Sequence, residues 1–265
     1  MQTVIKDNIE VEPNLYSRDF YFTCNDGFEE FQKGYGLSYI KKKELSLLDI
    51  HPGHKFLDIG HGRGEILYHL EKLGAFVYGV DYSDEANSIA KEVLRQSPNA
   101  KILKADCENL PFKNNFFDRI LISDLIEHLS FEKGIRLIKE TYRILASGGM
   151  FLLHTSPNAW FMKIIYPLLI NMVNKKKGNG IRQHVNIQNK VHVHEYSYFL
   201  LKKLARAAGI KAKIWVDNDL IRGGTFRHIK YPSRTVEAVK FFEKFCVFPI
   251  RIFLGNDLWM RFIKK

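Results

Sequence analysis

The chain has few cysteines and no long apolar run. Cys24, Cys107 and Cys246 lie far apart among its 265 residues and form neither a CxxC pair nor a metal-ligand spacing. These spacings argue against a disulfide framework and favour reduced thiols in a cytoplasmic protein. No apolar stretch reaches the roughly 20 residues that a membrane-spanning helix needs. Residues 1–8 lack the basic and apolar pattern of a secretory signal, so we expect a cytoplasmic protein.

Acidic residues are scarce in the second part of the chain. Residues 1–150 contain 19 lysines and arginines against 23 acidic residues, whereas residues 151–265 contain 21 against 6. The net charge of +11 therefore originates in the second part. Such a surface aids solubility, but an excess of this size favours an anionic partner: a phosphorylated substrate, a membrane surface or nucleic acid.

A short apolar run ends in a glycine-rich turn at residues 55–65, which read KFLDIGHGRGE. Gly60, Gly62 and Gly64 are followed by a helix-like pattern. This order predicts a buried strand that enters a tight turn at a helix N-terminus, where backbone N–H groups can approach an anionic ligand group closely. A dinucleotide-binding fingerprint would need a third glycine at position 65, which is Glu65.

Four further apolar segments end in polar residues. They read GAFVYGVD, AKILKADCENLPF, FDRILISDLIEHL and GGMFLLHTSPN, and they begin at residues 74, 100, 117 and 148. Their alternation with helical patterns predicts an α/β fold with a parallel sheet. Asp81 lies 21 residues after Gly60. At that strand end, an acidic side chain can accept hydrogen bonds from both hydroxyls of a ribose.

The motif D-x-G-x-G-x-G that begins at Asp58, together with these strand ends, resembles the class I S-adenosylmethionine (SAM) methyltransferases of the ubiquinone-biosynthesis and small-molecule type. The resemblance implies a doubly wound seven-stranded sheet of order 3-2-1-4-5-7-6 with an antiparallel last strand. It also implies that SAM is the cofactor and S-adenosylhomocysteine the product. The expected reaction is methyl transfer to O or N of a small-molecule, sugar or lipid-linked acceptor that is anionic or amphipathic.

The resemblance divides the chain into four parts. Residues 1–50 would form a helical segment over the cofactor site, in which an aromatic side chain closes the pocket. Residues 51–157 would form the SAM-binding core, residues 158–195 a cap, and residues 196–265 the rest of the sheet with a helical insertion at 232–254. Both insertions mix bulky apolar residues with lysine or arginine. Substrate caps and interfacial helices share this composition, so peripheral contact with the inner membrane surface is a further expectation.

The resemblance also assigns cofactor contacts to strand-end residues. Asp58 would orient the glycine turn or meet the methionine amino group, and the Gly60–Gly64 backbone would cradle the methionine portion. Asp81 would bind the ribose, Tyr82 would flank the adenine, and Asp106 would accept from the adenine amino group. The full expected set is Asp58, Gly60, His61, Gly62, Gly64, Asp81, Tyr82, Asp106, Cys107 and Ser123.

Histidines are the candidate catalytic residues. His128 follows the fourth expected strand, and an unperturbed imidazole titrates near neutral pH, as a general base should. His194 precedes a helix that usually faces the acceptor in similar enzymes. For each, a structural hydrogen-bonding role is the alternative. His192, His194 and Glu195 lack further ligands at a metal-binding spacing, so no metal site is predicted.

A second interpretation gives the chain no catalytic role: a SAM-binding module with a basic surface that binds RNA or a membrane. No nucleic-acid-binding motif accompanies the basic residues. The loop at Ser123–Ile126 also lacks the Asn/Asp-Pro-Pro-aromatic motif of enzymes that methylate base amines. Nucleic acid is therefore not the expected acceptor.

Overall fold

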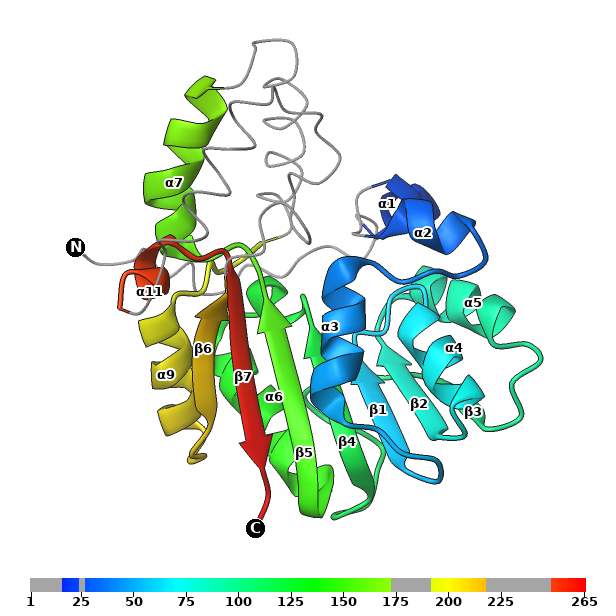
Figure 1. Cartoon of the computed structure of the whole chain (residues 1–265). Coiled ribbons are helices and arrows are strands. Elements are labelled where there is room, and N and C mark those ends of the chain that lie inside the picture. Colours follow the sequence, from blue (N-terminus) through cyan, green and yellow to red (C-terminus); the bar gives the residue numbers. More distant parts are fainter. Residues whose placement is uncertain (1–15, 24–26, 173–191, 218–248) are drawn as a thin grey trace.

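The protein contains a seven-stranded sheet of order β3-β2-β1-β4-β5-β7-β6. The computed structural model describes residues 16–23, 27–172, 192–217 and 249–265 (Figure 1). Strands β1 to β5 run parallel, and β7 is antiparallel to both β5 and β6. The predicted fold class and strand order are therefore confirmed. The strands are β1 (Lys55–Ile59), β2 (Phe76–Asp81), β3 (Ala100–Lys104), β4 (Phe117–Ser123), β5 (Leu145–Thr155), β6 (Lys213–Asp217) and β7 (Asp257–Ile263).

Serine residues begin four of the helices. The hydroxyls of Ser38, Ser83, Ser130 and Ser197 each accept a hydrogen bond from the backbone N–H three residues later, which satisfies a donor that has no partner within the helix. The helices are α1 (Arg18–Thr23), α2 (Phe28–Gln32), α3 (Tyr39–Leu48), α4 (Glu65–Lys72), α5 (Asp84–Val93), the 3₁₀ turn η2 (Ile126–His128), α6 (Phe131–Ile144), α7 (Ala159–Met172), α9 (Tyr198–Ala207) and α11 (Arg251–Leu254).

Both faces of the sheet are buried. On β4, Ile120 and Ile122 pack in the core beneath α6 and α9, whereas Leu121 packs on the opposite side with residues of α3, α4 and α5. Successive strand side chains point to opposite faces, so a strand covered on both sides is apolar throughout. This explains why the central strands read as short continuous apolar runs.

The strand order places a crevice at the carboxyl ends of β1 and β4. Chain connections leave these two neighbouring strands toward opposite edges of the sheet, and ligands of such sheets bind at this switch point. Helix α3 packs against the sheet, and α1 and α2 lie near the same strand ends, close to α4 and α5 (Figure 1). The N-terminal helices thus cover the crevice from one side.

The second expected insertion falls mostly outside the described residues, as does the cluster Lys175–Lys177. Of the two insertions, the structure describes α7 and the short stretch that includes α11, which contact each other. Helix α7 projects beyond the carboxyl end of β5 (Figure 1). Within the described ranges, no helix combines the length and apolarity required to cross a bilayer.

Candidate active site

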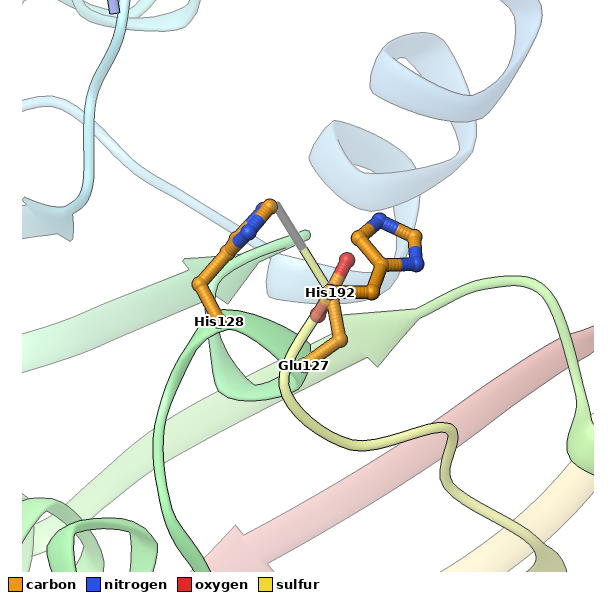
Figure 2. A group of neighbouring side chains, drawn as sticks. All are labelled: Glu127, His128 and His192. Carbon is orange, nitrogen blue, oxygen red and sulfur yellow. The ribbon is translucent and has the colours of Figure 1, made fainter. Parts of the chain in front are cut away.

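A cavity of about 1010 Å³ opens at the carboxyl ends of β1, β2 and β4. His128 lies in its wall, and Figure 2 shows this side chain with its neighbours Glu127 and His192. The wall contains all the predicted cofactor residues except Gly64, namely Asp58, Gly60, His61, Gly62, Asp81, Tyr82, Asp106, Cys107 and Ser123. Residues separated by up to 65 positions in the chain are therefore brought to one cavity.

The glycine turn is held in shape by Asp81. Gly60, Gly62 and Gly64 have φ values of +80°, +54° and +78°, a backbone region that residues other than glycine rarely adopt. The Gly62 N–H donates to Asp81 Oδ2 at 3.2 Å, and the Ser83 N–H donates to Asp81 Oδ1 at 2.9 Å. Gly64 lies outside the cavity wall because it begins α4, where an added Cβ would lie 2.9 Å from the Ala90 Cβ.

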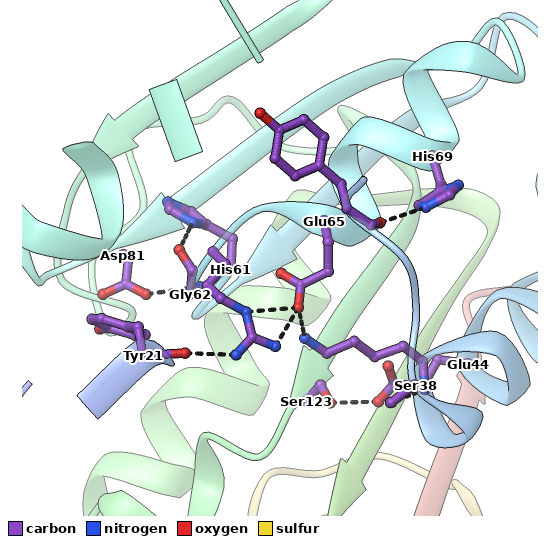
Figure 3. Close-up of polar contacts among 12 residues, drawn as sticks. Tyr21, Ser38, Glu44, His61, Gly62, Glu65, His69, Asp81 and Ser123 are labelled. Atoms are coloured by element: carbon purple, nitrogen blue, oxygen red, sulfur yellow. Dashed lines mark hydrogen bonds and ion pairs between the residues drawn. The ribbon is translucent and has the colours of Figure 1, made fainter. Parts of the chain in front are cut away.

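A buried charged cluster lies behind the turn, and the sequence did not indicate it. Arg63 donates from Nη2 and Nε to Glu65 Oε1 at 2.6 and 3.0 Å, and from Nη1 to the Tyr21 carbonyl oxygen at 2.6 Å (Figure 3). Lys41 of α3 donates to the same Glu65 oxygen. Burial alone would raise the pKa of Glu65, but the charges of Lys41 and Arg63 outweigh it and lower the pKa to about 2. The glutamate at the missing-glycine position thus anchors the turn to α1 and α3.

Two buried carboxyl groups lie at the bottom of the cavity. Asp58 lines the cavity, and Glu44 lies behind Ser123, which also lines it. Burial raises the pKa of Asp58 well above its usual range, and the neighbouring Glu44 raises it further. Burial also raises the pKa of Glu44 to about 7, against the smaller opposing effects of His154 and Ser123. Ser123 donates its hydroxyl to Glu44 Oε1 (Figure 3). Acids held protonated by burial ionise when a cation arrives, so this floor favours a positively charged ligand group.

Tyr16 spans the cavity. Its ring centroid lies 5.7 Å from that of Tyr82 and 5.9 Å from that of His128, with edge-to-face geometry in both pairs. Burial raises the pKa of Tyr16 above its ordinary value and raises that of Tyr82 to about 12. Both phenols therefore stay neutral at physiological pH and can donate hydrogen bonds. One aromatic residue of the N-terminal segment thus connects the predicted cofactor side to His128.

The loop after β4 is braced from β5. Thr155 donates its hydroxyl to Glu127 Oε2 at 2.8 Å. Burial raises the pKa of Glu127 to about 8, and the charge of Asp124 contributes in the same direction. His154 Nδ1 lies 3.2 Å from Asp124 Oδ1, and its Nε2 lies 3.4 Å from Asp257 Oδ1. Burial would lower the pKa of His154, but the two aspartates outweigh it and raise the pKa well above its ordinary value.

The structure separates the two candidate catalytic histidines. His128 lines the cavity, whereas His194 is buried and is not among the lining residues. The backbone N–H of His194 donates to the Glu127 carbonyl oxygen at 3.0 Å, so its segment docks on the loop after β4. His192, not His194, approaches His128, with ring centroids 5.1 Å apart.

Comparisons with known proteins agree with this architecture. A methyltransferase domain model matches residues 57–153. The chain is 31% identical over 163 residues to a phosphoethanolamine N-methyltransferase of Plasmodium falciparum, but the match covers only 58% of each chain. It is 30% identical over 189 residues to an uncharacterized protein of Methanocaldococcus jannaschii, which covers 67% of this chain and 70% of the relative.

A solved structure extends the similarity of the fold. Phosphoethanolamine N-methyltransferase 2 of Haemonchus contortus, in complex with SAM, superposes with a TM-score of 0.58 at 18% identity. The superposition covers 93% of this chain and 59% of that protein. At this identity the likeness concerns the fold.

Proposed function

Because the chain belongs to the class I SAM-dependent methyltransferases, we propose that it transfers the methyl group of SAM to an oxygen or nitrogen atom of a small acceptor bound beside His128. The observation that carries this proposal is the single cavity that extends from Asp81 to His128. Pockets for one small ligand measure about 300–1,000 Å³. The cavity of about 1010 Å³ lies at the upper end of this range, which supports a cofactor together with a small acceptor.

The residues of the cavity fit SAM. The glycine turn brings its backbone to the cavity wall with no Cβ at Gly60 or Gly62, which supports a close approach of the methionine portion, and the buried Asp58 suits an ammonium group. Asp81 is placed to accept from ribose hydroxyls while it holds Gly62. Tyr82 and Asp106 would contact the adenine. When bound, SAM supplies a methyl group on a sulfonium, whose leaving group is a neutral thioether.

The remaining task of the protein is to orient the acceptor and exclude water. Tyr16 covers the cavity between Tyr82 and His128 and is 9% exposed. His128 faces the acceptor side and would either accept a proton from the acceptor or hold it in place. A hydroxyl acceptor must lose its proton, so one group on this side of the cavity has to assist the loss.

The proposed acceptor is anionic or amphipathic. The basic second part of the chain supports an anionic group, and phosphoethanolamine in the name of the Plasmodium falciparum relative supplies one example. Trp160, Phe199 and Phe253 form an exposed aromatic group at α7, α9 and α11, with ring centroids 5.7 and 6.0 Å from Phe253. This group supports an acceptor with an apolar part and peripheral contact with an anionic membrane.

Binding and turnover can be tested separately. Titration calorimetry with SAM and S-adenosylhomocysteine tests the cofactor, and release of S-adenosylhomocysteine tests turnover with a panel that begins with phosphoethanolamine and includes hydroxylated and lipid-linked acceptors. A folded protein that binds neither nucleoside would refute the proposal. SAM binding without turnover of any acceptor, combined with salt-sensitive RNA binding, would instead favour the non-catalytic module.

A further inference from the structure

Three side chains of types that can bind a metal ion gather beside the cavity, and one of them, His128, lines it. Glu127 and His128 belong to η2, and His192 lies on the segment that leads to α9. One ligand atom from each of them lies within 4.8 Å of the other two, and Figure 2 shows the Glu127 carboxylate between the two imidazoles. Among the residues that the structure describes, these three form a group of histidine and acidic side chains close enough to share one metal ion.

Backbone contacts place His192 in this group. The N–H groups of Val193 and His194 both donate to the Glu127 carbonyl oxygen, at 2.8 and 3.0 Å. The segment is thereby docked directly on η2. Thr155 fixes the Glu127 carboxylate by a hydrogen bond to Oε2. A ligand carboxylate oriented by such a neighbour is a regular feature of metal sites.

The burial of the carboxyl group and the donor set also favour a cation. Glu127 is 2% exposed, and a carboxylate buried to this extent is costly unless a positive group compensates it. Two imidazoles and one carboxylate form a donor set that suits divalent first-row transition metals such as Zn²⁺, Mn²⁺, Fe²⁺ and Co²⁺.

We propose that Glu127, His128 and His192 bind a divalent transition-metal ion that holds an oxygen atom of the acceptor. The proposal rests on the proposed methyltransferase function and specifies a hydroxyl-bearing acceptor. Three protein ligands leave coordination positions for water or for an acceptor oxygen. Because His128 lines the cavity, an ion bound there lies at the wall where the acceptor would be located.

The metal ion replaces the general base. Coordination lowers the pKa of a bound hydroxyl, so its proton leaves to water before methyl transfer. The O–CH₃ bond then forms as the S–CH₃ bond breaks, and the sulfur keeps the electron pair of the broken bond. His128 cannot accept the proton while its nitrogen coordinates the ion. Under this proposal the histidine is a metal ligand instead of the predicted general base.

Metal content tests the proposal without an activity assay. The purified protein is stripped with a chelator, loaded with Co²⁺, dialysed, and measured by elemental analysis and visible absorption. We expect about one equivalent of Co²⁺ with d–d bands of a site that contains nitrogen ligands. Glu127→Gln and His192→Gln should each lose the bound ion and the bands, while SAM affinity measured by calorimetry stays within about twofold because neither residue lines the cofactor side.

A matched control addresses adventitious binding. The exposed His51 and the partly buried His54 form a pair at the amino end of the sheet, with ring centroids 5.3 Å apart. The double variant His51→Gln/His54→Gln should retain the full equivalent of bound Co²⁺. Thr155→Val should weaken Co²⁺ binding about 10- to 100-fold, since it frees the ligand carboxylate.

Two results would overturn the proposal. Wild-type protein that binds SAM but retains no Co²⁺ has no such site, and loss of the ion in the His51/His54 variant would assign it to the surface pair. SAM binding and Co²⁺ content are independent readouts. Failure of the methyltransferase proposal is therefore distinguishable from failure of the metal proposal.

Discussion

The turns after β1 and β4 lie at neighbouring strand ends but are built differently. The turn after β1 presents backbone groups, and its last two glycines alternate with the charged residues Arg63 and Glu65. The loop after β4 presents side chains that are held by partners from later parts of the chain, such as Thr155 and His154. A local sequence motif therefore suffices to recognise the first turn, whereas the second is defined by tertiary contacts.

This difference has a functional consequence. A cofactor common to a whole family can be held by backbone groups at a fixed spacing. An acceptor specific to one enzyme needs side chains, and their partners differ from protein to protein. The following predictions test the division between the two turns, from the largest expected effect to the smallest.

Glu65→Gln should destabilise the protein most. The change leaves Arg63 buried without its carboxylate, and breaking a buried ion pair costs about 3–5 kcal/mol of unfolding free energy. The folded pKa of Glu65 is about 2, below its ordinary value of 4.5. Its contribution is therefore present above pH 4.5 and is lost as the pH falls toward 2. Urea denaturation at neutral and acidic pH measures both effects.

The control for this experiment is Glu71→Gln on the same helix, which should change the unfolding free energy by at most about 0.5 kcal/mol. Equal losses in the two variants would show that the cluster does not anchor the turn.

His154→Asn should destabilise the loop after β4 in a pH-dependent way. The folded pKa of His154 is raised above its ordinary value of 6.5 by Asp124 and Asp257, although burial opposes this. The stabilisation is therefore complete below pH 6.5 and is lost as the pH rises through the folded pKa. We expect a loss of about 1.5–3 kcal/mol near pH 5.5 and a smaller loss near pH 9. The control is His51→Asn, which changes an exposed histidine. The charged group of His154, Asp124 and Asp257 is contradicted if the loss of unfolding free energy does not depend on pH, or if it equals the loss in the control.

Asp81→Ala should weaken SAM binding by about 1–3 kcal/mol, or about 5- to 150-fold. The variant removes the proposed acceptor for the ribose hydroxyls and also releases the Gly62 N–H. Calorimetry measures the loss. Asp84→Ala removes an exposed acid three positions later and should change the affinity by at most about twofold. An unchanged affinity in Asp81→Ala would place the ribose elsewhere.

Trp160→Ser and Phe253→Ser should each weaken binding to anionic vesicles by about 1 kcal/mol, if α7 and α11 contact a membrane. Their rings lie together on the exposed aromatic group. Co-sedimentation at low salt measures the change. Phe76→Ser is the control, because Phe76 is equally exposed but lies at the amino end of β2. If the wild-type protein stays in the supernatant, it does not bind the vesicles. The exposed aromatic group would then contact only the acceptor.

The sequence predicted the fold because its signals are local. Apolar runs, serine caps and the spacing of Gly60 and Asp81 all lie within single strand-helix units, and the strand order follows from the family. The cluster around Glu65 was missed because Lys41 lies 24 residues before it and comes from another helix. Glu44 was missed for the same reason, since its partner Ser123 is 79 residues away.

The histidines show the limit most clearly. Sequence proximity grouped His192 with His194 and Glu195, whereas the fold turns His192 toward His128 and buries His194 in another direction. His192 and His194 are two residues apart and would point to the same side of a regular extended segment. Residue 193 lies in a bend, and only the docking of the segment on the Glu127 carbonyl oxygen decides that His192 approaches His128.

The sequence by itself determined the sheet, the glycine turn and the cofactor, because each depends on hydrogen-bonding and packing patterns within a few dozen residues. Only the tertiary structure decided which side chains meet on the proposed acceptor side of the cavity. Tyr16, Glu127, His128 and His192 come from three separate regions of the chain, and their meeting depends on how α1, η2 and the segment before α9 pack at the end of β4. Packing between distant elements has no fixed spacing in the sequence, so the acceptor side could not be read there.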